Sequence, residues 1–146
     1  MEERAPIQTV AMLVGAVFLL LGILGFVPGV TSHYGVMTFA GHGSGAKLFG
    51  VFQVSVLHNI VHLMLGLAGV SMAKTHDGAR SFLLAGGIVS ALLFLYGLAF
   101  HGASGANWLP VNTADNILHG ALGAGMIALA YAFARRDRAG GRRVAA

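Results

Sequence analysis

The sequence contains no cysteine and few charged residues, and each absence excludes a class of protein or site. Without cysteine the chain forms no disulfide bond and offers no thiolate ligand to a metal ion. Charged residues make up only 10% of the 146 residues, whereas about a quarter is usual in soluble domains. Hydrophobic residues make up 56%. This composition is that of a membrane protein and not of a soluble globular domain.

Four long apolar runs dominate the chain, at about 7–29, 48–73, 81–100 and 113–134. A helix needs about 20 apolar residues to cross a hydrocarbon core. The runs are apolar on all sides, whereas barrel strands alternate in polarity, so helices must satisfy the backbone hydrogen bonds in lipid. The first run is longer than a signal-peptide core and has no A-x-A site after it. We expect an all-α fold, a single four-helix transmembrane domain over 1–146 with a basic tail at 135–146.

The basic residues predict the orientation of these helices. Cytoplasmic ends of membrane helices carry an excess of lysine and arginine. Most basic residues lie before the first run, between the second and third, or after the fourth, which places both termini of a multi-pass cell-membrane protein in the cytoplasm. The tail "RRDRAGGRR" directly follows a membrane span, so we interpret it as a topology signal that meets anionic lipid and not as a nucleic-acid site. The residues on that side are Arg4, Lys74, Arg80, Arg135, Arg136, Arg138, Arg142 and Arg143, and Lys47 lies on the other.

The second and fourth runs resemble each other. When the chain is shifted by 57 positions, "LHNIVHLMLG" at 57–66 aligns with "ADNILHGALG" at 114–123, and both asparagine and histidine coincide. This predicts two tandem helical hairpins related as parallel repeats, which would place the matching polar residues at similar depths and facing each other.

These segments also carry a family resemblance. "FGVFQVSVLHNIVHLMLGLAGV", "VNTADNILHGALG" and the "FVPG" that closes the first run resemble a bacterial family of small four-helix membrane proteins catalogued as a domain of unknown function. More distantly, the arrangement is similar to the DoxX-type and SPW-repeat membrane proteins. The resemblance implies the four-helix fold and no established activity.

The polar residues of the two related runs predict a metal site. His58 and His62 are four residues apart and share a helix face, as do Asp115 and His119. If the pairs face each other, three imidazoles and a carboxylate suit a transition metal such as zinc, iron or copper. Two asparagines lie one position from a cluster residue, where they would support the ligands by hydrogen bonds, and two loop histidines could form a lid or lend a further ligand. These are Asn59, Asn116, His33 and His42.

The sequence leaves three other uses of these residues open. His62 and His119 alone would suit a haem b, with Gly66 and Gly123 leaving room for the macrocycle. The histidines would also suit proton transfer or pH sensing. In the third interpretation the polar residues only hydrogen-bond across helices in an accessory or scaffold protein. Asp115 then has an ordinary role in the first turn of a helix capped by Asn112 or Thr113.

Enzymatic activity is not the leading hypothesis. No nucleophile, base and orienting group occur together, and no carboxylates pair at catalytic spacing in the spans. Beyond the lipid bilayer, small residues every four positions in the fourth run favour close helix contact, either within the bundle or in a homodimer or with another membrane subunit. These residues are Gly120, Ala124, Ala128 and Ala132.

Overall fold

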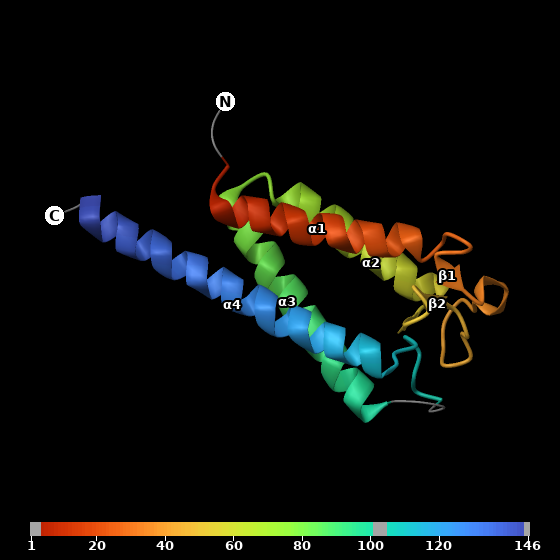
Figure 1. The fold of residues 1–146 in the computed structure, drawn as a ribbon. Coiled ribbons are helices and arrows are strands. Elements are labelled where there is room, and N and C mark those ends of the chain that lie inside the picture. The colour runs from red at the N-terminus through yellow and green to blue at the C-terminus, as the bar shows by residue number, and fades with distance from the viewer. Residues whose placement is uncertain (1–3, 101–104, 145–146) are drawn as a thin grey trace.

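The computed structural model describes residues 4–100 and 105–144, and four α-helices account for most of them. They are α1 (Pro6–Leu24), α2 (Val56–Met72), α3 (His76–Ala99) and α4 (Thr113–Val144). Successive helices run in opposite directions, so both ends of the chain lie at one end of the molecule (Figure 1). The predicted all-α four-helix class is confirmed.

The helices pack as two hairpins, α1 with α2 and α3 with α4 (Figure 1). Glycines allow the close approach in each hairpin. A Cβ added at Gly66 of α2 would lie 2.5 Å from the backbone nitrogen of Leu19, and one added at Gly123 of α4 would lie 2.8 Å from that of Ala91. Backbone therefore fills the space in front of both glycines. The two contacts occupy matching positions of α2 and α4 under the shift of 57 residues.

The buried apolar core lies between the hairpins, toward the end of the molecule where α2 turns into α3. Small and large side chains alternate in it, which lets the helices approach closely while the larger side chains fill the remaining space. The core residues are Ile7, Ala11, Phe18, Ala73, Ala79, Phe82, Leu83, Met126 and Ala130.

A small cap joins α1 to α2 at the opposite end of the molecule (Figure 1). It contains β1 (Thr31–Ser32), β2 (Lys47–Leu48) and β3 (Phe52–Gln53), antiparallel in the order β1-β2-β3, and a short 3-10 helix η1 (Tyr34–Val36). The predicted helix over 48–73 was wrong at its start, because Phe49 and Gly50 form a turn with positive φ angles of 53° and 71°. Leu48 before this turn and Val54 after it are buried in the cap, whereas Phe49 and Val51 remain exposed.

Other helix ends also differ from the predicted ones. The first helix ends at Leu24 and not near 29, because the chain turns at Pro28 and Gly29, whose φ is +94°. The third helix begins at His76 and not at 81, because the Thr75 side chain accepts a hydrogen bond from the Gly78 N–H and caps it. The first residues of this helix are mostly polar, so the apolar run begins several residues after the helix does.

The fourth helix begins at Thr113, as predicted, but continues to Val144 through the basic tail. Arginine and alanine are good helix formers, so the tail extends the helix past the end of the apolar segment. In Figure 1 this end of α4 projects beyond the other helices. Residues 145 and 146 of the predicted tail lie outside the described residues.

Within the part of the chain that the structure describes, three segments are long and apolar enough to cross a membrane: α1, α3 and Thr113–Arg135 of α4. α2 is a shorter apolar helix of 17 residues, about 25 Å long at 1.5 Å per residue. Large apolar side chains remain exposed on all four helices, as expected where lipid covers the surface. They include Leu13, Leu20, Met64, Leu67, Leu92, Leu95 and Ile117.

Candidate metal centre

The start of α2 places two histidines on one face. Ser55 caps the helix, and its hydroxyl accepts a hydrogen bond of 3.2 Å from the backbone N–H of His58. His62 follows one turn later, so its side chain lies on the same face as that of His58. The centroids of the two imidazole rings are 4.5 Å apart.

Hydrogen bonds at the start of α4 likewise fix the position of the third histidine. The Asn112 side chain accepts a hydrogen bond from the Asp115 N–H at 3.0 Å, and the Asp115 carboxylate accepts one from the Asn112 N–H at 2.9 Å. These reciprocal bonds fix the first turn, as the sequence predicted for Asn112. His119 lies one turn after Asp115. Both His62 and His119 are the seventh residue of their helix, roughly 9 Å from its start at 1.5 Å per residue.

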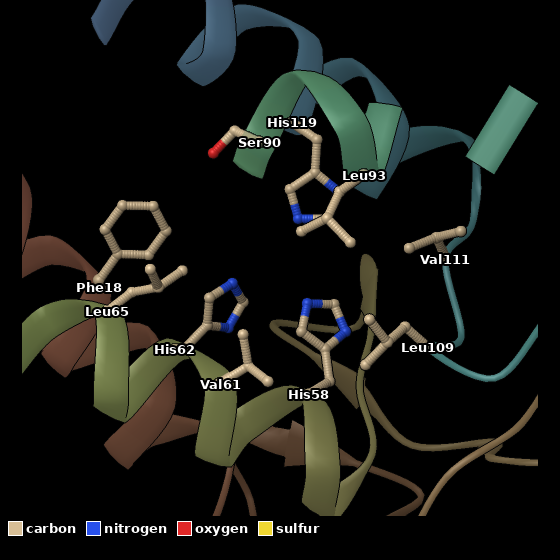
Figure 2. A pocket seen from close by; sticks show the side chains of 10 residues that line it. All are labelled: Phe18, His58, Val61, His62, Leu65, Ser90, Leu93, Leu109, Val111 and His119. Atoms are coloured by element: carbon tan, nitrogen blue, oxygen red, sulfur yellow. The ribbon is translucent and has the colours of Figure 1, made fainter. Parts of the chain in front are cut away.

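The imidazoles of His58, His62 and His119 meet between the two hairpins, and we call them the histidine triad. One nitrogen of each ring lies within 4.8 Å of one nitrogen of each of the others. Figure 2 shows the rings around a common space, with His58 and His62 on one side and His119 opposite. Nitrogens around a tetrahedral zinc ion are roughly 3.4 Å apart, given zinc–nitrogen distances of about 2.0–2.1 Å. Small rotations of the side chains would therefore close the triad on one ion.

The histidine triad is buried and poorly satisfied. The exposed fraction is 4% for His58, 8% for His62 and 3% for His119. Among the described residues, the Nδ1 atom of each ring is buried without a hydrogen-bond partner. Each buried polar atom that lacks a partner costs about 1–3 kcal/mol. A protein that places three such groups together gains from a ligand that binds their nitrogens.

The histidine triad lines a small cavity with mostly apolar walls. The cavity volume is about 10 Å³, which is roughly the space that one water molecule needs. The cavity therefore suits a single ion with at most one small ligand. Its other lining residues are Phe18, Val61, Leu65, Ser90, Leu93, Leu109 and Val111 (Figure 2).

A haem does not fit this arrangement. The haem alternative needs space at Gly66 and Gly123, and the backbones of α1 and α3 occupy that space. The cavity is also far smaller than the pockets of about 300–1,000 Å³ that hold organic ligands. The described residues thus fit a metal ion and leave no room for a macrocycle.

Asp115 lies apart from the histidine triad and connects the cap to α4. Its carboxylate Oδ2 accepts hydrogen bonds from two backbone N–H groups, Gln53 at 3.0 Å and Asn112 at 2.9 Å. It does not belong to the group whose ligand atoms converge. Because Gln53 lies just before α2, these bonds hold the start of α4 beside the start of α2.

The two asparagines face away from each other, each toward the preceding helix. A Cβ added at Gly25 would overlap the Asn59 carboxamide, and one added at Gly97 would overlap that of Asn116. Among the described residues, no hydrogen bond joins either amide to the histidine triad, and the Asn59 Nδ2 instead lies 3.9 Å from the sulfur of Met37. The asparagines therefore pack within their own hairpins.

The two loop histidines considered for a lid lie in the cap. His33 and His42 are both exposed, and neither is among the three residues that converge. Leu109 and Val111, from the segment between α3 and α4, line the cavity instead.

Two lining residues escaped the sequence prediction. The Phe18 ring packs near His62 with centroids 5.7 Å apart, and nothing in the sequence distinguishes it from other apolar residues of α1. Ser90 has a signal that was overlooked. It is the single polar residue in the run 82–95, "FLLAGGIVSALLFL", and polar residues inside membrane spans usually have a role.

Comparison with known proteins identifies a family and no characterised relative. The model of a family described as domain of unknown function DUF4383 matches residues 8–132. No curated protein and no solved structure matches the chain.

Proposed function

Because the chain belongs to the DUF4383 family, whose description assigns no activity, we propose its function from the site. It is a multi-pass membrane protein that binds one divalent transition-metal ion through His58, His62 and His119. The observation that carries the proposal is the convergence of three buried imidazoles from two different hairpins. Interhelical hydrogen bonding alone does not account for it, since the three Nδ1 atoms lack partners among the described residues.

The ligand set narrows the choice of metal. Imidazole nitrogens suit zinc, copper, iron and nickel, whereas magnesium and calcium prefer oxygen ligands. Three protein ligands leave the fourth position of a tetrahedral ion open, which is the arrangement of reactive metal sites and not of closed structural ones. A reactive or sensing centre therefore fits better than a purely structural ion.

The distribution of charge supports a site in the outer half of the bilayer. Lys74 lies in the turn between α2 and α3, at the end of the molecule where both termini lie (Figure 1). The positive-inside rule assigns this end to the cytoplasm. The histidine triad lies near the opposite ends of α2 and α4, beneath the cap, so metal would reach it from outside the cell.

Elemental analysis of the purified full-length protein tests the proposal. We expect close to one zinc, copper, iron or nickel ion per chain, and loss of most of this metal in His62→Ala and in His119→Ala. His33→Ala is the matched control, because His33 is exposed in the cap, and it should keep the metal. A protein that is free of metal after growth with these ions, and equally stable in the triad variants, would instead support an accessory or scaffold role.

A further inference from the structure

We infer that Ser90 holds the ligand at the fourth coordination position of the metal ion. The inference rests on the proposed function and adds the kind of ligand that the site accepts. The ligand is one water-sized molecule or anion that accepts a hydrogen bond from the Ser90 hydroxyl, such as water, hydroxide or fluoride.

The first evidence is that Ser90 is a buried residue whose hydroxyl makes no hydrogen bond within the described part of the chain. Only 2% of the residue is exposed. Serines inside membrane helices commonly donate to the carbonyl oxygen one turn earlier, which here belongs to Gly86. Within residues 4–100 and 105–144 the Ser90 hydroxyl makes neither this bond nor another. Because its oxygen is not among the fully buried atoms that lack a partner, the hydroxyl reaches the cavity that the residue lines and is free to donate to a ligand there.

The second evidence is the place of Ser90 beside the histidine triad. Ser90 lies on α3 and lines the same cavity as the three imidazoles. Figure 2 shows it on the His119 side of the space that the rings enclose. If the three histidines held a tetrahedral ion, its fourth position would remain open, and a ligand bound there would share the cavity that Ser90 lines. Ser90 supplies the one polar side chain other than the histidines among the lining residues.

The cavity also limits the size and chemistry of that ligand. The cavity volume is about 10 Å³, roughly the space of one water molecule, so a ligand of one heavy atom is the largest that fits. The remaining walls are aliphatic or aromatic and offer no charge. Selection therefore depends on the metal ion, on size and on the hydrogen bond from Ser90. Ser90 is a positioning residue, since it acts on the bound ligand and not on the metal.

Fluoride binding to the cobalt(II)-loaded full-length protein tests this role. Fluoride is small, accepts hydrogen bonds and changes the visible absorption of cobalt when it enters the coordination sphere. A hydrogen bond to a charged group contributes about 1.5–3 kcal/mol, so Ser90→Ala should weaken fluoride binding by about tenfold or more. Cobalt content should remain at the wild-type level. Ser81→Ala is the matched control, because Ser81 lies on the same helix and is exposed, and it should leave fluoride affinity unchanged.

The possible results separate this inference from the proposed function. Equal fluoride affinity in the wild type and Ser90→Ala, with cobalt bound in both, would overturn the role of Ser90 and leave the metal site standing. If the absorption spectrum of the cobalt-loaded wild type did not change when fluoride was added, the inference of an open coordination position would be overturned. A wild type that binds no cobalt would overturn the metal site itself. If Ser90→Ala were unstable, the wild type alone would still test whether the open position is small. Its spectrum should respond to fluoride and should not respond to the larger azide ion.

Discussion

The imidazoles of His58 and His119 lie with ring centroids 5.9 Å apart although they belong to different helical hairpins. The α2 and α4 backbones make few direct contacts, so the two side chains bridge a gap between the hairpins. Any ion bound there would link the hairpins directly. The same relationship explains why the fixed starts of α2 and α4 matter, since each histidine is placed by the cap of its own helix.

Replacement of Asp115 should affect folding and not metal content. Asp115→Ala removes the acceptor for two backbone N–H groups, Gln53 and Asn112. We expect a loss of about 1–3 kcal/mol in the free energy of unfolding, because these donors are left without a partner. Asp115→Asn keeps one carbonyl oxygen as an acceptor and should lose less.

Thermal unfolding in detergent, combined with elemental analysis of the same samples, checks this prediction. Metal should remain at the wild-type level in both variants. If Asp115→Ala lost its metal while its unfolding temperature stayed at the wild-type value, the carboxylate would be a ligand after all and the structural role would be wrong.

The glycines between paired helices should be intolerant of a methyl group. In Gly123→Ala the new Cβ would lie 2.8 Å from the backbone nitrogen of Ala91, and backbone cannot rotate away as a side chain does. We expect a destabilisation of about 1–3 kcal/mol from the forced shift of α3 against α4.

Gly125 is the matched control for this prediction, since it lies on the same helix and a Cβ there would meet nothing within 4 Å. Gly125→Ala should be neutral or stabilising by up to about 1 kcal/mol, because alanine favours a helix. Equilibrium unfolding in mixed detergent micelles gives both values. Equal tolerance of the two alanines would show that α3 and α4 do not approach as described.

The absence of cysteine makes the topology directly testable. Gly43→Cys introduces a thiol in the exposed cap, and Lys74→Cys introduces one in the turn between α2 and α3. With the cap outside the cell, a membrane-impermeant maleimide should label the first variant in intact cells and the second only after the membrane is opened. The reverse pattern would place the cap and the histidine triad on the cytoplasmic side.

Sequence alone predicted the features that depend on long or capped segments. The number of helices followed from the apolar runs, and the start of α4 followed from Asn112 and Asp115, which cap it as expected. The convergence of His58, His62 and His119 followed from helix periodicity and from the likeness of the two segments. These features depend on neighbouring residues or on a segment that occurs twice, so the sequence pattern predicts them.

The features that sequence did not predict depend on tertiary packing. Strands β2 and β3 have two residues each, one at the start of an apolar run and one inside it, so no periodicity distinguished them from a helix. Gly66 and Gly123 were interpreted as open space, whereas each contacts a neighbouring backbone. Asp115 was paired with His119 by spacing, but its carboxylate turns to the N–H of Gln53 in the cap. None of these partners lies within a helical turn in the sequence.

X-ray absorption at the edge of the bound metal tests the central claim most directly. For zinc, we predict three imidazole nitrogens and one further light atom at about 2.0–2.1 Å, with the multiple-scattering pattern that imidazole rings produce. In His62→Ala the fit should fall to two imidazoles or the metal should be lost. A wild-type spectrum without imidazole scattering, or one that is unchanged in His62→Ala, would contradict the account.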